Sequence, residues 1–461
     1  MKKSTFFILV ILTCLTAVFL SSCSDSLNSE TQDNSPSQIS NEENSDISSD
    51  QTDTGKSAPE NTENLFAFEE ISNGLSIVGL NCSVEELHIP SLINGKPVIE
   101  IGERAFSGCK AIKTLTVEDG VKKISGEAFK NCTSLQTVVL PESLEYIGYA
   151  SFNGCSSIKS ITLPFTGERE KTKAETYSYP FGYIFGKQKY TGGVETVQYY
   201  YYDSLNEVVS SPYCIPSTLK VVKVTGKGET QIPYDAFRSM ENLEKIIVGG
   251  KVKSIGKFAF SVCYAEIIWE NCQIKRFDEF SLADYKGSAF TIPESVEKIC
   301  RCAFEDCEYL REIAVPSSVK EIDLFAFRGC TRMTKAVINE GVEKLGVNAF
   351  YFCTSLKEVS LPASLKEIAD SAFMSCKALP RIEIPDGVEI IGKDAFKNCT
   401  ALKNIVFEEK NGWRYYNSTT SGDYITERTA SDSTLIAYYL TDRYRDYIWE
   451  NVASAQINSA R

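Results

Sequence analysis

The sequence predicts a β-rich solenoid of about 13 rungs, each 22–24 residues long, in which short strands alternate with short helical turns. The first observation behind this prediction is a 23-residue unit that recurs without interruption from Cys307, Cys330, Cys353 and Cys376. The second is that each unit carries apolar residues near its 4th, 7th, 9th, 13th and 16th positions. Because one unit cannot bury its hydrophobic face alone, the copies must stack on a continuous core.

Each rung is expected to contain two short strands. The 4th, 7th and 9th positions form the pattern L-x-x-I-x-L, and the proline that often follows ends this strand because it has no N–H for the ladder. The residues that remain are too few for a helix of about 11 residues. We therefore expect a second short strand around the 16th position, followed by a tight helical turn that carries an Ala-Phe pair.

The N-terminus predicts export and a lipid anchor. Lys2 and Lys3 precede an apolar run from Phe6 to Leu20, which is short for a membrane span. The run ends in Leu-Ser-Ser-Cys, which resembles the cleavage motif of bacterial lipoproteins. Residues 1–22 are thus expected to be a lipoprotein signal peptide and Cys23 the lipidation site, with an ordinary signal peptide as the alternative.

Residues 23–64 are expected to be a disordered acidic tether rich in Ser and Asn. From residue 24 on they hold ten acidic residues, one lysine (Lys56) and almost no apolar side chains, so they cannot bury a core. The whole chain has a net charge of -13 and no basic stripe. Nucleic acid is therefore an unlikely class of partner on electrostatic grounds.

The repeats divide into two runs, with residues 65–104 as the N-terminal cap and first rung. The solenoid is expected over 105–164 and again over 218–408. The expected strand centres are Leu87, Leu115, Val138, Ile161, Val222, Ile246, Ile268, Phe290, Ile313, Ala336, Val359, Ile382 and Ile405. The phenylalanine of the Ala-Phe pair, with Ser replacing Ala once, is at Phe106, Phe129, Phe152, Phe237, Phe260, Phe304, Phe327, Phe350, Phe373 and Phe396. One repeat, with the sequence FDEFSLAD, has lost the Ala-Phe pair, and we call it the worn repeat.

Two segments depart from the repeat. Residues 165–217 form a Tyr-rich insertion, which is either functional or a packed β-excursion that buries its rings and exposes its hydroxyls. Residues 409–461 are expected to be the C-terminal cap and tail, in which Trp413, Tyr415, Tyr416 and the apolar stretch from Leu435 to Trp449 cover the last rung.

The cysteines are expected to be packing residues. Nine of the 16 hold one repeat position, and we interpret them as buried free thiols, with disulfides as the alternative: Cys109, Cys132, Cys155, Cys263, Cys307, Cys330, Cys353, Cys376 and Cys399. A metal site built from Cys300, Cys302 and Cys307 is disfavoured for the same reason. The single histidine, His88, is expected on the surface. We predict no enzyme, no catalytic residues, no metal and no cofactor.

The repeat C-x-x-L-x-x-I-x-L-P-x-S-L-x-x-I-x-x-x-A-F resembles the BspA-like leucine-rich repeats of bacterial surface lipoproteins, over about 65–410. The segment PFGYIFG, followed by YTGG, QYYYY and IPSTL, resembles an insertion found in that family. The resemblance implies a non-catalytic protein displayed on the cell surface, with adhesion known for some members. It supplies no catalytic residues to transfer.

A ligand-binding surface is expected on the open face of the sheet, directly after the insertion. The candidate residues are Val221, Lys245, Ile247, Ile267 and Trp269, which are expected to point away from the core, and the tyrosines Tyr199, Tyr200, Tyr201 and Tyr202. In the alternative arrangement, the insertion folds back over these rungs and covers them.

The predicted function is lipid-anchored binding of a protein or glycan ligand at the cell surface, in adhesion or host and cell interaction. The alternative is a solute-capture or envelope-structural lipoprotein that works with neighbouring envelope components. Both place the protein outside the cytoplasm, anchored to a bacterial membrane and facing the extracellular side.

Overall fold

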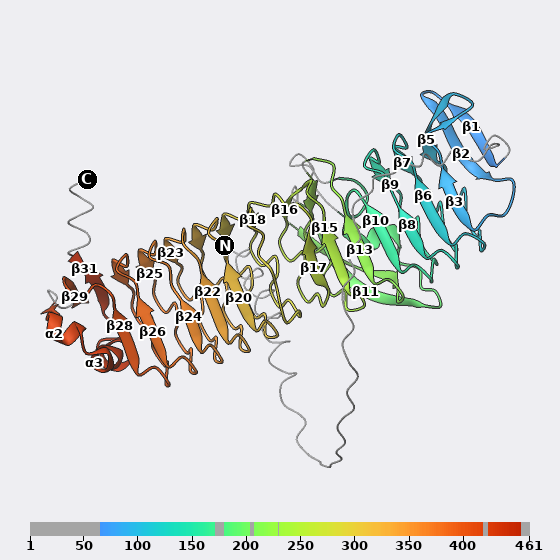
Figure 1. Ribbon diagram of the computed structural model, residues 1–461. Helices are drawn as coiled ribbons and strands as arrows, with labels where there is room; N and C mark the ends of the chain where they lie inside the picture. Colours follow the sequence, from blue (N-terminus) through green and yellow to red (C-terminus); the bar gives the residue numbers. More distant parts are fainter. Residues whose placement is uncertain (1–64, 171–178, 203–206, 229, 418–422, 453–461) are drawn as a thin grey trace, which may run out of the picture. The chain divides into compact units, whose positions relative to one another are not determined.

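A computed structural model describes residues 65–170, 179–202, 207–228, 230–417 and 423–452. The signal peptide, the tether and Cys23 lie outside the described residues. The described residues belong to one compact unit. This unit is a β-solenoid of about 14 turns, close to the expected 13, and successive rungs stack in sequence order (Figure 1).

One side of the solenoid is formed by parallel strands, which we call the open-face sheet. Its first part has seven strands, and after an interruption it continues in groups of three and two. The strands are β3 (Glu86–Ile89), β6 (Thr114–Val117), β8 (Thr137–Val139), β10 (Ser160–Leu163), β13 (Val221–Val224), β15 (Lys245–Val248), β17 (Glu266–Trp269), β20 (Glu312–Val315), β22 (Lys335–Ile338), β24 (Glu358–Ser360), β26 (Arg381–Ile384) and β28 (Asn404–Phe407). Every second side chain points into the core.

The other side is a ladder of shorter strands, as the 16th repeat position predicts. Its strands are β5 (Lys96–Ile101), β7 (Lys123–Ile124), β9 (Tyr146–Ile147), β14 (Thr230–Ile232), β16 (Val252–Ile255), β18 (Arg276–Phe277), β19 (Lys298–Ile299), β21 (Glu321–Ile322), β23 (Lys344–Leu345), β25 (Glu367–Ile368) and β27 (Ile390–Ile391). From β14 to β27 this ladder is continuous, even where the open-face sheet is interrupted.

The segment that carries the Ala-Phe pair is a hydrogen-bonded turn and not the helical turn that we expected. In the rung of Phe350, Asn348 and Phe352 both adopt the left-handed conformation, with φ of 57° and 63°. A right-handed helix cannot pass through such residues. Instead, the Phe350 N–H donates to the Ala372 carbonyl of the next rung at 2.8 Å, so the turns are bonded to one another along the stack.

The phenylalanines form a buried column. All ten side chains of the Ala-Phe series are fully buried. Within each regular run the rings stack on their neighbours, with centroids 5.0 Å apart for Phe304 and Phe327 and 5.7 Å apart for Phe373 and Phe396. This spacing follows that of parallel strands, so one ring per rung fills the core without gaps.

The cysteines of the repeat are free thiols, as expected. All 14 cysteines among the described residues are free, and of the nine repeat cysteines only Cys109 is less than fully buried. The structure adds a contact that the sequence did not show. Each of seven thiols donates to the backbone carbonyl of the column residue one rung earlier, at 3.0–3.3 Å: Cys132, Cys155, Cys307, Cys330, Cys353, Cys376 and Cys399.

The worn repeat interrupts the open-face sheet. Phe290, one of the expected strand centres, is in a segment without strand structure and packs partly buried against the core. Leu282 takes the place of a phenylalanine in the column, because its N–H donates to the Ala303 carbonyl just as that of Phe304 donates to Ala326. A ring cluster that includes Trp269, Phe277 and Phe290 fills the space.

Both ends of the solenoid are capped. At the start, the antiparallel pair β1 (Phe66–Ile71) and β2 (Gly74–Leu80) joins β5, which also pairs with β4 (Leu92–Ile93). At the end, β31 (Ile448–Asn451) pairs with β27, and β29 (Trp413–Tyr416) and β30 (Asp423–Tyr424) extend this sheet. Trp413 and Trp449 are buried there.

The short helices of the described part lie in the cap and the insertion. The cap contains α2 (Glu427–Ala430), α3 (Ser433–Tyr438) and the π-helical turn η3 (Tyr439–Arg443), and the insertion contains the 3-10 turn η2 (Phe181–Ile184). Within the described ranges we find no helix with the length and apolar character needed to cross a membrane.

Candidate binding surface

The first part of the insertion acts as a turn of the solenoid. The Phe152 N–H donates to the Ile184 carbonyl at 2.9 Å, and the Phe181 N–H donates to the Ala236 carbonyl at 3.3 Å. The Phe181 ring is buried, with its centroid 5.4 Å from that of Phe237. Turn η2 therefore bridges the phenylalanine column across the insertion.

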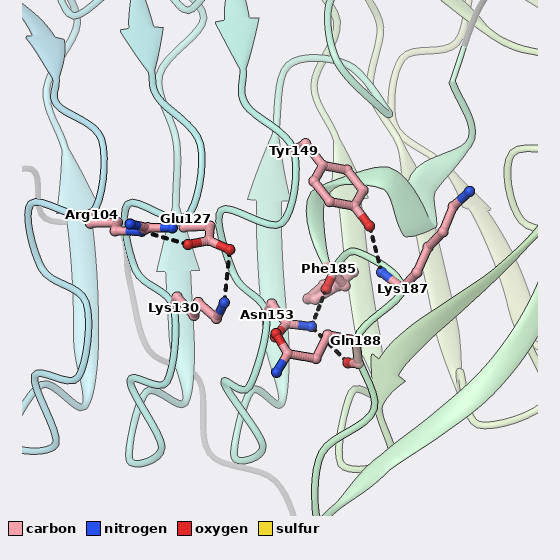
Figure 2. A network of polar contacts seen from close by, with 8 residues as sticks. All are labelled: Arg104, Glu127, Lys130, Tyr149, Asn153, Phe185, Lys187 and Gln188. Atoms are coloured by element: carbon pink, nitrogen blue, oxygen red, sulfur yellow. Dashed lines mark hydrogen bonds and ion pairs between the residues drawn. The ribbon is translucent and has the colours of Figure 1, made fainter.

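Polar contacts hold this turn to the preceding rung (Figure 2). The Asn153 amide donates to the carbonyl oxygens of Phe185 at 2.8 Å and Gln188 at 2.9 Å. The hydroxyl of Tyr149 accepts a hydrogen bond from the Lys187 N–H at 2.9 Å. Because Asn153 is buried, these bonds replace contacts with water and fix the start of the insertion.

The second part of the insertion is an antiparallel hairpin of β11 (Gly193–Tyr202) and β12 (Glu207–Pro216). One face of the hairpin is buried and includes Thr196, Gln198, Ser211 and Tyr213. The opposite face carries Val197 and Val208, which are 44% and 50% exposed. The hairpin is therefore a packed β-excursion with one free apolar face.

Gln198 is the main polar anchor of the hairpin. Its side-chain oxygen accepts from the Gly182 N–H at 2.8 Å, and its amide nitrogen donates to the Ala236 carbonyl at 2.9 Å. Gln198 is fully buried. It thus supplies the acceptor for the Gly182 N–H and a second donor to the Ala236 carbonyl, which also accepts from the Phe181 N–H.

Asp235 forms the second anchor. Its buried carboxylate accepts from the Tyr199 N–H at 2.6 Å and lies 3.3 Å from the Arg238 guanidinium. The guanidinium in turn lies 5.0 Å from the centroid of the Tyr199 ring. Burial raises the pKa of Asp235 to about 7, although Arg238 and the Tyr199 N–H both favour the charged form.

The described part of the hairpin does not cover the open-face sheet. Its anchoring contacts are with Gly182, Asp235 and Ala236, which all belong to the turns of the phenylalanine column. On the sheet, Val221, Ile247 and Ile268 remain partly exposed. We call these three residues the apolar strip. They lie on β13, β15 and β17, and Ile247 is directly beside Ile268 in the register.

Charged side chains border the apolar strip in ion pairs. Lys223 and Glu270 are 2.6 Å apart, and Lys245 and Glu266 are 3.8 Å apart. The lysine that we expected to contact ligand, Lys245, is thus exposed and paired. An apolar centre with a polar rim is the usual composition of a protein-binding surface.

The orientation expected for Ile267 and Trp269 is wrong. Ile267 pairs with the inward-facing Ile246 and is only 7% exposed, and Trp269 pairs with the buried Val248. The Trp269 ring nitrogen donates to the Thr291 carbonyl at 2.9 Å. The outward residue of this strand is Ile268, which we expected at the centre of the core-facing pattern.

The run Glu-Ile-Ile-Trp has three apolar residues in a row, so alternation cannot decide its register. The number of residues between the repeat cysteine and the strand does indicate the register. Cys307 precedes the buried Ile313 by six residues, whereas Cys263 precedes Ile267 by four, so the corner of this rung is two residues shorter.

The expected tyrosines are all in β11. Tyr199 is half-buried beside Arg238. Tyr200, Tyr201 and Tyr202 belong to the strand, but their side chains are outside the described part. Gln198, Asp235 and Arg238 were missed because each is a single polar residue whose partner lies in a distant repeat.

The described residues contain no group of three or more His, Cys, Asp or Glu side chains placed to hold a metal ion. Cys300 and Cys302 are free, and burial raises the pKa of Cys300 to about 11. His88 is exposed and lies 2.7 Å from Glu118.

Comparison with solved structures finds bacterial repeat proteins. A leucine-rich repeat protein from Bacteroides ovatus ATCC 8483 is 20% identical, with 74% of this chain and 86% of that chain covered and a TM-score of 0.32. A leucine rich cell surface protein from Faecalibacterium prausnitzii A2-165 is 19% identical, with 78% and 97% covered and a TM-score of 0.25. The T. pallidum leucine rich repeat protein is 20% identical, with 63% and 88% covered and a TM-score of 0.23.

A search of curated proteins finds no match. The family model described as "BspA type Leucine rich repeat region" matches in six copies, over residues 80–179, 230–346 and 320–420. These ranges cover more than half of the chain and coincide with the stacked rungs on both sides of the hairpin. The chain therefore belongs to the BspA-type leucine-rich repeat family.

Proposed function

We propose that this protein is anchored to a bacterial membrane through an acylated Cys23 and binds a partner protein outside the cell. The binding surface is the apolar strip. Membership of a family of surface repeat proteins supports display on the cell surface. The charged N-terminus, the apolar run and the Leu-Ser-Ser-Cys motif support the anchor.

The apolar strip is the observation that carries this proposal. Val221, Ile247 and Ile268 are on three consecutive strands of the open face, and Ile247 is directly beside Ile268 in the register. These side chains point away from the solenoid core and lie beside two ion pairs, and burying them against a partner would be favourable. The solenoid is in this view a non-catalytic scaffold.

The double variant Ile247→Ser, Ile268→Ser tests the proposal. The full chain carrying Cys23→Ala is screened against immobilised extracellular matrix proteins and glycans, and the variant is then tested against each hit. We expect at least a tenfold loss of affinity for a protein hit, because two central apolar contacts are removed. The melting temperature should stay within a few degrees, since neither side chain lies in the core.

Val337→Ser is the matched control. Val337 occupies the same column of the open face as Ile268, three rungs further on, and it is also half-exposed. It should leave binding unchanged. Equal losses in the control and the double variant would place the ligand elsewhere, and hits only among glycans would replace a protein partner with a carbohydrate.

Radioactive palmitate labelling tests the anchor separately. The wild-type chain should incorporate label and fractionate with membranes. The Cys23→Ala variant should do neither, because the acyl chains provide the attachment. Equal incorporation by both proteins would contradict lipidation at Cys23 without affecting the proposed binding surface.

A further inference from the structure

The outer edge of β12 carries backbone N–H and carbonyl groups that are not used in the β11–β12 ladder. The Cys214 N–H donates to the Gly186 carbonyl at 2.8 Å, outside the β11–β12 ladder, and the Tyr199 N–H donates to Asp235. The register pairs Cys214 with Glu195 and Tyr199 with Ser210. Both are therefore pairs without mutual hydrogen bonds, and every second residue of β12 directs its N–H and carbonyl outward.

These outward groups of β12 belong to Val208, Ser210, Pro212 and Cys214. Cys214 is bonded to Gly186, and Pro212 has no N–H, which suits its place at an outward position. Within the described part of the chain, the N–H groups of Val208 and Ser210 have no hydrogen-bond acceptor. Val208 is 50% exposed and Ser210 is also exposed, so the edge is open to solvent.

The pattern of donors and acceptors on this edge is complementary to itself. When two copies pair antiparallel about a twofold axis at Ser210, the two Ser210 residues exchange N–H to carbonyl bonds. The Val208 N–H of each copy then meets the Pro212 carbonyl of the other. The free N–H groups of Val208 and Ser210 both find acceptors in this pairing. Pro212 has no N–H, so it adds no donor that would need one.

The side chains on the exposed hairpin face support the same pairing. Val197 is paired with Pro212 in the register and is 44% exposed, so the two lie on the same face as Val208. Pairing across the twofold axis would place Val208 of one copy against Pro212 of the other. The result is a four-stranded sheet with one continuous apolar face, in place of a two-stranded sheet with an open edge.

We propose that the β12 edge is a self-association site at which two copies of this chain pair through Val208, Ser210 and Pro212. The site is separate from the apolar strip and does not depend on the proposed ligand. Its consequence for a surface protein is bivalency, because each dimer would present two open-face sheets. A ligand with two binding sites would then gain avidity without new contacts.

Sedimentation velocity of the full chain carrying Cys23→Ala tests the proposal over about 1–100 μM, where weak protein association becomes visible. We expect the mass to rise from one chain to two as the concentration increases. Ser210→Pro removes the central N–H from both copies and should weaken association about tenfold to a hundredfold. The substitution leaves the β11–β12 ladder intact, because the Ser210 N–H is not part of it.

Ser210→Ala is the matched control, since it keeps the backbone N–H, and it should associate like the wild type. A wild-type chain that remains a single chain at the highest concentration would overturn the proposal. So would a Ser210→Pro variant that associates as tightly as the Ser210→Ala variant.

A cross-linking experiment covers the case in which Ser210→Pro disturbs the hairpin. In a Cys23→Ala, Cys82→Ser background, which lacks the one thiol classed as exposed among the described residues, Ser210→Cys should form an intermolecular disulfide under mild oxidation. Directly hydrogen-bonded antiparallel partners lie about 5.5 Å apart at Cα, within disulfide range. Val194→Cys, which is 40% exposed but far from the axis, should not cross-link. Equal cross-linking of both variants would contradict the twofold axis at Ser210.

Discussion

The rungs from Phe304 to Phe396 and the middle of the chain, from 165 to 292, solve the same packing problem with different residues. In the regular rungs, each turn supplies one phenylalanine to the column and one thiol to the preceding carbonyl. In the middle, Phe181 enters the column from the insertion and Leu282 replaces a phenylalanine. The comparison shows what the stack requires: an apolar side chain at each position of the core column and hydrogen bonds between successive turns. It does not require the same sequence in every rung.

The two regions differ most on the surface. The late open face carries more charged residues, some of which form ion pairs, as Lys335 does with Glu358 at 2.6 Å. The middle adds a hairpin anchored by buried polar groups, and it carries the apolar strip on β13, β15 and β17. The irregular region therefore keeps the core of the solenoid and changes what the surface can bind.

Phe350→Ala should produce the largest effect in this comparison. Its ring is fully buried between Phe327 and Phe373, with centroids 5.1 and 5.4 Å away, so the loss leaves a cavity that rigid neighbouring rungs cannot close. We expect a loss of about 3–5 kcal/mol in the free energy of unfolding, measured in urea. Glu358→Ala, at an exposed ion pair, should change it by less than about 1 kcal/mol. Equal changes would contradict the inward register of the rung.

Leu282→Ala tests the substitute residue in the column. Leu282 is fully buried in the worn repeat, and we expect a loss of about 2–4 kcal/mol, smaller than for Phe350 because less surface is removed. Urea unfolding of both variants under the same conditions gives the comparison. A loss below about 1 kcal/mol would show that the neighbouring aromatic rings fill the space and that Leu282 is not needed in the column.

Gln198→Ala should loosen the hairpin while leaving the regular rungs intact. The change leaves the buried Gly182 N–H without a partner and removes one of the two hydrogen bonds of the Ala236 carbonyl, at a cost of about 1–3 kcal/mol. Hydrogen exchange should accelerate over 193–216 and remain slow over 304–407. Glu195→Ala, on the exposed face of the same strand, should leave exchange unchanged. Acceleration throughout the chain would show that the hairpin and the solenoid unfold together.

Asp235 should make the middle of the chain sensitive to pH. Because burial raises its pKa from 3.8 to about 7, the folded state holds a proton that the unfolded state has released. The contribution to stability is full below about pH 4, falls as the pH rises and is lost above about pH 7. It amounts to a few kcal/mol at most, since one pKa unit is worth about 1.4 kcal/mol.

Asp235→Asn keeps an oxygen for the Tyr199 N–H but cannot ionise. The difference in unfolding free energy between wild type and variant should therefore change between about pH 4 and pH 7 and be constant outside this window. A difference that is the same at every pH would mean that Asp235 titrates equally in both states.

The thiols should produce the smallest effect. Alkylation of the denatured chain should find the repeat cysteines free, and a reducing agent should leave the melting temperature unchanged. Burial raises the pKa of Cys330 and Cys376 and keeps both as neutral donors to a carbonyl. Disulfide-linked peptides from adjacent rungs would contradict this arrangement.

The sequence by itself determined the period of the repeat and the inward positions of the regular rungs, and it favoured buried free thiols over disulfides. These features follow from local spacing, because each rung repeats the same apolar positions and stacks on its neighbour. The ten phenylalanines of the Ala-Phe series could be assigned to the core for this reason.

Only the tertiary structure decided how the irregular middle is arranged. The orientation of Ile267 and Trp269 depends on pairing with β15, since three adjacent apolar residues fit either register. The roles of Gln198 and Asp235 depend on partners that are 38 and 36 residues away in the sequence, Ala236 and Tyr199. No local pattern specifies such partners, because the contacts form only when the hairpin packs on the stacked turns.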